Sequence, residues 1–111
     1  MGGGRGPSAH ETVKWSVHIR SRGEKEIAEA WKWYEKRQPG LGDRLIDEVS
    51  RAVHTLEQDA DRFPLYYRNF RRILLVRFPY KIFYMLEGNR AVIFRVLHAK
   101  REHRSRLPHE V

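Results

Sequence analysis

The chain has 111 residues, 41% hydrophobic and 12% aromatic, which is enough for one domain with its own core but not for two. It has no cysteine, which excludes a disulfide framework and a thiolate zinc site, and no apolar run approaches the ~20 residues that span a bilayer. We therefore expect a cytoplasmic protein, and its formal charge of +8 suggests an anionic partner such as nucleic acid or an acidic protein.

This charge is unevenly distributed along the chain. Residues 64–111 hold 11 basic and 3 acidic side chains, whereas residues 23–63 hold 7 basic and 10 acidic ones. A field of one sign confined to one part of a fold attracts polyanions and speeds encounter with them. The last third of the chain is therefore expected to carry the surface that binds a partner.

The first twelve residues, MGGGRGPSAHET, contain four glycines and a proline but no apolar stretch typical of a signal peptide. They are predicted to form a disordered leader, followed by one domain over residues 13–107 and a short tail over residues 108–111. The domain begins with VKWSVHIR, residues 13–20, in which apolar and polar residues alternate. This period of two predicts a strand with one buried face.

Two helices are predicted next. Ser21 lies three residues before Glu24, which suggests a capping box at the start of a helix that ends near Gln38. Pro39 and Gly40 then break the chain, and a second helix carries an apolar stripe of Leu41, Leu45, Val49, Ala52 and Leu56. Helices joined by so short a break should form a hairpin that covers one face of a sheet.

Beyond residue 64 the pattern becomes that of strands. The segments RNFRRILLVR, YKIFYML and AVIFRVLH are rich in β-branched and aromatic residues, and Gly88 and Asn89 form a two-residue hairpin turn between the last two. The expected fold class is therefore α+β, in the order β-α-α-β-β-β, with the helical hairpin packed on one face of a small, mainly antiparallel sheet. The other face is expected to be half open, with Lys81 on it and with Arg71 or Arg72 reaching it according to strand register.

Three segments carry a family resemblance. PGLGDRLIDEV, RRILLVRFPYKIFY and VLHAKR, in this order, closely resemble the RelE/ParE superfamily of bacterial toxins, which includes plasmid stabilisation proteins. The resemblance extends over roughly Val13 to Leu107. It implies the toxin of a type II toxin-antitoxin system that inhibits growth and is neutralised by a cognate antitoxin whose partly disordered segment wraps the toxin. It also implies contact with operator DNA only through the antitoxin, and no contact with a membrane. Separately, the sequence contains no motif that implies a cofactor.

The superfamily implies two possible targets. In its RelE-like branch the toxin enters the ribosome and cuts messenger RNA by driving a ribose 2′-hydroxyl onto the adjacent phosphate, which leaves a 2′,3′-cyclic phosphate. That reaction needs a base, an acid and cations against the developing charge. In the ParE-like branch the toxin poisons DNA gyrase by binding it. A third possibility is an inactive member that acts only as a corepressor with its antitoxin.

The resemblance allows the ribonuclease residues to be matched one by one. Lys81 falls on the family's strand arginine, Arg72 on the first of two strand lysines, and Arg101 on the arginine after the final strand. The second lysine falls on Leu74 and the C-terminal tyrosine on Leu107, which can neither ionise nor form a hydrogen bond. These two departures favour the ParE-like branch.

If the chain cuts RNA, the expected catalytic residues are Arg72, Lys81, Arg101 and His103. Further contacts to the target are expected from Arg71, Arg77, His98, Lys100 and Arg104. Each of these could also be an ordinary solvated side chain, and a structural role is the first expectation for His98. The spacing of the histidines predicts no metal site.

Trp33 lies off the apolar stripe of the first predicted helix. An exposed tryptophan there would suit a contact with the antitoxin or the target.

Overall fold

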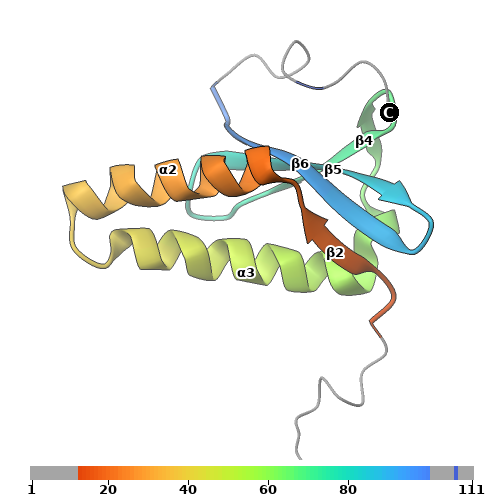
Figure 1. Ribbon diagram of the computed structural model, residues 1–111, viewed down its shortest axis with the longest axis horizontal. Helices are drawn as coiled ribbons and strands as arrows, with labels where there is room; N and C mark the ends of the chain where they lie inside the picture. The colour runs from red at the N-terminus through yellow and green to blue at the C-terminus, as the bar shows by residue number, and fades with distance from the viewer. Residues whose placement is uncertain (1–12, 101–106, 108–111) are drawn as a thin grey trace, which may run out of the picture.

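A helical hairpin lies across one face of a five-stranded sheet in the computed structural model of the chain, which describes residues 13–100 and 107 (Figure 1). The elements follow in chain order: β2 (Ser16–Ile19), α2 (Ser21–Arg37), α3 (Leu41–Asp59), the 3-10 turn η1 (Ala60–Arg62), β3 (Leu65–Tyr67), β4 (Phe70–Leu74), β5 (Tyr80–Glu87) and β6 (Arg90–His98). The predicted α+β fold class and the helical hairpin are confirmed.

The sheet has the order β2-β6-β5-β4-β3, in which β2 runs parallel to β6 and the other pairs are antiparallel. The sequence did not predict β3, because three residues are too few for a periodic pattern. The first strand is shorter than predicted. The amides of Lys14 and Trp15 donate to the carbonyl of Glu57 at the end of α3 instead of to a neighbouring strand.

The helix bounds follow the sequence, but the predicted capping box is wrong. Arg20 is the N-cap of α2, Ser21 is already helical, and no side chain caps this end. The turn into α3 is closed by Glu35, whose carboxylate accepts hydrogen bonds from the amides of Gly40 (2.8 Å) and Gly42 (2.9 Å). Gly40 has a φ of 90°, a left-handed conformation that favours glycine.

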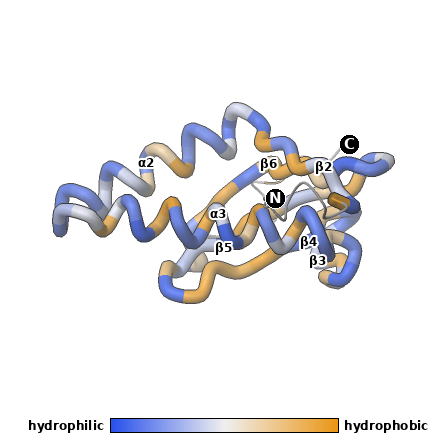
Figure 2. Tube along the Cα trace, turned by 90° about the horizontal axis from the view of Figure 1, so that it is seen from below, coloured by the Kyte–Doolittle hydropathy of each residue, from blue (hydrophilic) through white to orange (hydrophobic). Residues whose placement is uncertain are grey.

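The main core fills the space between the hairpin and the sheet. The predicted stripe of α3 faces the sheet, and its Leu45, Val49, Ala52 and Leu56 are buried. In Figure 2, hydrophobic and hydrophilic residues alternate along the helices, as expected for helices with one apolar side. The two helices approach closely at Gly42, where a Cβ atom would lie 2.7 Å from the Trp31 ring.

Tyr84 ties this core to η1. Its side chain is fully buried and its hydroxyl donates a 2.6 Å hydrogen bond to the carbonyl of Ala60. Burial raises the pKa of the Tyr84 phenol well above its ordinary value of 10.0, although the nearby Arg71 guanidinium opposes the shift.

A pH dependence of stability follows from Tyr84. Because the unfolded chain ionises this phenol before the folded one does, its contribution to the free energy of unfolding is complete below about pH 10 and is lost as the pH rises further. Tyr84→Phe is expected to cost about 1–2 kcal/mol at neutral pH, since the Ala60 carbonyl loses its partner. It should also flatten the decline above pH 10. Urea unfolding at neutral and alkaline pH tests this, and an alkaline decline that is unchanged in the variant would contradict it.

A second apolar cluster lies on the outer face, by which we mean the face of the sheet away from α2 and α3. Its members are Phe70, Phe83, Met85, Val92, Phe94, Leu97 and Leu107. Leu107, near the C-terminus, is only 2% exposed. The expectation of a half-open second face therefore needs correction. The centre of the outer face is closed and includes a residue of the chain's own C-terminal part, whereas exposed side chains such as Arg20 and Leu74 lie around it.

Candidate functional site

Arg72 and Lys81 share the outer face. Arg72 pairs with Phe83, a member of the outer apolar cluster, and Lys81 pairs with Leu74 two positions further along the same two strands. The two cations are therefore diagonal neighbours on adjacent strands. Both are half-buried at the margin of the cluster, and the Arg72 guanidinium lies 4.1 Å from the centre of the Tyr66 ring. The sequence left open whether Arg71 or Arg72 reaches the outer face. The strand register places Arg72 there.

His98 lies on the opposite side of the sheet. It pairs with Tyr80, whereas Lys81 pairs with Leu97 on the outer face. The His98 ring stands at 74° to the Tyr80 ring with 5.3 Å between centroids, and its Nδ1 accepts a 3.2 Å hydrogen bond from the Lys100 amide. These contacts fit a structural role at the end of β6.

A bulge in β6 explains the position of His98. Tyr84 pairs with Ile93 but its neighbour Phe83 pairs with Arg95, so β6 holds one extra residue at this point. An extra residue reverses the alternation of side chains beyond it. Without the bulge, His98 would lie on the outer face with Val92 and Phe94.

The remaining predicted target contacts are dispersed. Arg71 is directed to the chain itself, because its Nη1 donates to the carbonyls of Asp61 (3.2 Å) and Phe63. Arg77 lies in the loop between β4 and β5 with a largely exposed side chain, and Lys100 follows the end of β6. Arg101, His103 and Arg104 lie outside the described residues.

Trp33 is half exposed, as the proposed partner contact requires. The guanidinium carbon of Arg37 lies 3.9 Å from the centre of the Trp33 ring, and this ring packs edge-on against the Tyr34 ring. The partner contact itself stays a prediction.

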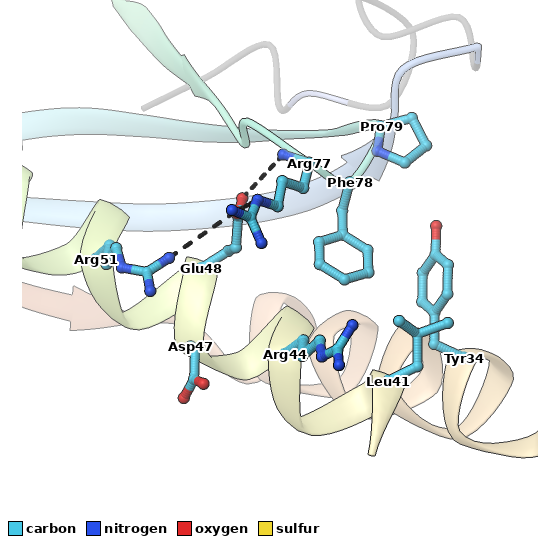
Figure 3. A pocket seen from close by; sticks show the side chains of 9 residues that line it. All are labelled: Tyr34, Leu41, Arg44, Asp47, Glu48, Arg51, Arg77, Phe78 and Pro79. Carbon is cyan, nitrogen blue, oxygen red and sulfur yellow. Dashed lines mark hydrogen bonds and ion pairs between the residues drawn. The ribbon is translucent and has the colours of Figure 1, made fainter. Parts of the chain in front are cut away.

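A groove of 440 Å³ separates the helical hairpin from the β4–β5 loop; we call it the hairpin groove (Figure 3). It is lined by Tyr34, Leu41, Arg44, Asp47, Glu48, Arg51, Arg77, Phe78 and Pro79. The Phe78 ring points into it and packs edge-on against Tyr34, with 4.9 Å between centroids. Burial raises the pKa of the Tyr34 phenol above 10.0, although the Arg37 charge opposes the shift.

Glu48 holds one wall of the hairpin groove in place. Its side chain is only 7% exposed, and Oε1 accepts hydrogen bonds from the amides of Val76 (3.0 Å) and Arg77 (3.1 Å). The other oxygen, Oε2, lies 3.9 Å from Arg51 Nη1 and 4.0 Å from Arg77 Nε. This carboxylate therefore fixes the β4–β5 loop on α3. The Val76 side chain in this loop is 90% exposed.

The rim of the hairpin groove is positive. Arg44, Arg51 and Arg77 surround the apolar floor, whereas the Asp47 carboxylate points away from it (Figure 3). Since Glu48 is occupied by the loop, the groove offers an apolar floor and arginine side chains to a partner. This combination fits an acidic segment that also carries apolar side chains.

A second groove, of 580 Å³, lies between α2 and the end of β6 and is lined partly by His98 and Trp33. Here the Glu26 carboxylate binds Arg95, with Oε2 at 2.8 Å from Nε and 2.5 Å from Nη2. Its other oxygen accepts a 2.7 Å hydrogen bond from the Val96 amide. The side chains of this ion pair are 11% and 12% exposed, so it holds α2 against the bulge of β6.

Sequence reasoning missed several of these residues. Glu48 carried a signal, because it lies seven residues after Leu41 and three after Leu45 and so occupies the apolar stripe of α3. An acidic residue on a buried stripe is expected to form hydrogen bonds or an ion pair within the protein, because an unpaired buried charge is costly. Nothing comparable marks Glu26 or Tyr66.

Within residues 13–100 and 107, no cluster of three or more potential metal ligands is found. The helices in the same part of the chain are too short or too polar to cross a membrane.

Comparisons with known proteins agree with this architecture. One solved structure, described as the chromosomal ParDE TA system from P. aeruginosa, superposes with a TM-score of 0.71 at 16% sequence identity. The match covers 79% of this chain and 99% of the other, and at this identity it shows a shared fold. No curated protein sequence matches the chain. The family model of the ParE toxin of the type II toxin-antitoxin system, parDE, matches residues 17–103. The chain therefore belongs to the ParE toxin family.

Proposed function

We propose that this chain arrests bacterial growth by binding and poisoning DNA gyrase, and that a cognate antitoxin neutralises it. Membership of the ParE toxin family supports this reading. Beyond family membership, the proposal is supported by the positions of the cationic side chains and of a histidine on opposite faces of the sheet. Arg72 and Lys81 lie together on the outer face, whereas His98 lies on the other.

This division favours binding over RNA cleavage. Cleavage by way of the 2′-hydroxyl needs proton transfer beside the cations that stabilise the phosphate. His98 cannot supply it next to Arg72 and Lys81, because the sheet lies between them. Cleavage would therefore depend on His103, which lies outside the described residues. Two cations beside an apolar cluster are instead a sufficient basis for docking on a protein surface.

The function is tested by inducing the toxin alone and following DNA and protein synthesis separately. A gyrase poison is expected to stop DNA synthesis first and to induce the DNA damage response and filamentation. Immediate arrest of translation with cuts in messenger RNA would contradict the proposal and support the RelE-like alternative. Unaffected growth would contradict it as well and would favour a corepressor.

The hairpin groove is our proposed contact for the antitoxin. Its apolar floor fits the apolar side chains of a segment that folds on binding, and Arg44, Arg51 and Arg77 fit the acidic ones. The Arg44→Glu/Arg51→Glu variant is therefore expected to bind the antitoxin about 100-fold more weakly, since each reversed charge costs about 1–2 kcal/mol.

Calorimetric titration with the cognate antitoxin measures this loss. Lys25→Glu/Lys32→Glu is the matched control, because both lysines are exposed on α2 and neither lines the groove. Equal losses in the two variants would show that net charge, and not the groove, determines affinity.

A further inference from the structure

Two exposed apolar side chains lie close together at the end of β4 and in the loop that follows it. Leu74 is 55% exposed and Val76 is 90% exposed, whereas Leu75 between them is buried in the main core. A single exposed aliphatic side chain is common on a protein surface, but neighbouring ones on a fixed part of the chain are typical of a contact with a partner. We call Leu74 and Val76 the apolar knob.

The backbone under the apolar knob is held in place although it lies at the surface. Oε1 of Glu48 accepts a 3.0 Å hydrogen bond from the Val76 amide, and the Leu75 amide donates a 3.0 Å hydrogen bond to the carbonyl of Tyr80. The buried side chains of Leu75 and Phe78 anchor the loop on either side of Val76. Since a fixed contact loses little conformational entropy on binding, the apolar knob is preorganised for a partner.

The apolar knob is continuous with the charged part of the outer face. Leu74 pairs with Lys81, and Arg72 precedes Leu74 by two positions on β4 and so lies on the same face. On the other side of the knob, Arg77 follows Val76 directly and its side chain is largely exposed. The knob therefore extends the proposed target surface, and its cationic surroundings favour an acidic partner.

The shape of the apolar knob distinguishes between two kinds of partner. A segment that folds on binding is best accommodated by a groove, which supplies walls on both sides of it. A protruding aliphatic side chain instead needs a pocket in its partner, and preformed pockets are a feature of folded proteins. The knob therefore fits a folded target better than the disordered segment of an antitoxin.

We propose that Leu74 and Val76 insert into an apolar pocket, edged by carboxylates, on the folded target protein. This inference rests on the proposed function, and it adds the apolar contact that the cations of the outer face do not supply. Arg72 and Lys81 hold the target through charge, whereas the apolar knob holds it through the burial of apolar surface.

The test is a titration of the purified full-length toxin into gyrase, plasmid DNA and ATP, with linear plasmid as the readout. Leu74→Ser/Val76→Ser is expected to raise the toxin concentration at half-maximal effect at least about tenfold, because two apolar contacts are lost. Leu74→Met/Val76→Ile keeps both side chains apolar and should act nearly as well as the wild type.

Binding of the antitoxin to the serine variant is measured by calorimetry. Neither Leu74 nor Val76 lines the hairpin groove, so the affinity for the antitoxin should change less than about twofold. A loss of antitoxin affinity as large as the loss of activity would assign the apolar knob to the antitoxin and overturn the proposal.

The matched control removes exposed apolar side chains elsewhere. Leu65 is 57% exposed and pairs with Arg71, so it lies on the other face from Leu74. Val13 is 47% exposed and precedes β2, at the far edge of the sheet. Val13→Ser/Leu65→Ser should therefore change the half-maximal toxin concentration less than about twofold. Circular dichroism confirms that each variant is folded before its activity is scored.

Three further results would overturn the apolar knob. The first is a Leu74→Ser/Val76→Ser variant as active as the wild type, and the second is an equal loss in the control variant. The third is a wild type that sediments as a dimer and a serine variant that sediments as a monomer, because the knob would then bind a second copy of this chain.

Failure of the proposed function gives a different result, because the wild type itself then produces no linear plasmid. Growth arrest after induction of the wild type and of the two serine variants then tests the apolar knob against the target that the toxin has. Arrest that is lost only in Leu74→Ser/Val76→Ser would support the knob without gyrase. A wild type that neither traps gyrase nor arrests growth would overturn both proposals.

Discussion

Replacing Arg72, Lys81 and Arg101 together with glutamine is expected to abolish growth arrest. Arg72 and Lys81 are neighbours on the outer face, and Arg101, outside the described residues, is included on sequence grounds. If each of the three charges contributes about 1 kcal/mol to a charged interface, their combined loss should weaken target binding about 100-fold. Colony counts after induction without antitoxin measure the effect.

The matched control removes three charges elsewhere. Lys25, Lys32 and Lys36 are exposed along α2, so their triple glutamine variant changes net charge equally without touching the outer face. It should stay toxic. Full toxicity of the Arg72, Lys81 and Arg101 variant would refute this surface as the one that acts on the target.

Glu26→Ala is expected to cost about 3–5 kcal/mol of the free energy of unfolding, the largest stability effect that we predict for a single substitution. The substitution leaves Arg95, whose side chain is 12% exposed, without its carboxylate, and it also leaves the Val96 amide without an acceptor. Urea unfolding followed by circular dichroism measures the loss. In a domain of this size it could remove most of the net stability.

Two further variants separate the buried charge from helix propensity. Glu29→Ala changes an exposed glutamate of the same helix and should alter stability by less than about 0.5 kcal/mol. Glu26→Leu/Arg95→Leu removes both charges and should be more stable than Glu26→Ala, because no buried charge remains unpaired. If the double variant is the less stable of the two, the ion pair itself, and not the penalty of an unpaired arginine, determines the effect.

Local patterns predicted the helices well. The apolar stripe of α3 and the break at Pro39 and Gly40 depend on residues close in sequence, and the structure places Leu41 at the first position of that helix. The Gly88 turn likewise lies between β5 and β6, with a φ of 62°. Such features need no knowledge of the rest of the fold.

The faces of the strands were harder to predict because they depend on contacts between distant residues. Whether Arg71 or Arg72 reaches the outer face depends on the pairing of β4 with β5. The position of His98 depends on a bulge that no glycine or proline marks in β6. The family resemblance implied that Leu107 falls on the C-terminal tyrosine of the RelE-like branch, but in the fold it is a buried member of the outer cluster. Nothing in its polar surroundings along the chain predicts that burial.

The most direct test of gyrase poisoning uses purified gyrase, plasmid DNA, ATP and the purified toxin. The toxin is expected to trap gyrase in its cleaved state, so that linear plasmid accumulates after denaturation of the enzyme. The antitoxin should prevent this accumulation, and the glutamine variant of Arg72, Lys81 and Arg101 should not cause it. If linear plasmid does not increase while the same preparation cuts messenger RNA on purified ribosomes, gyrase is not the target.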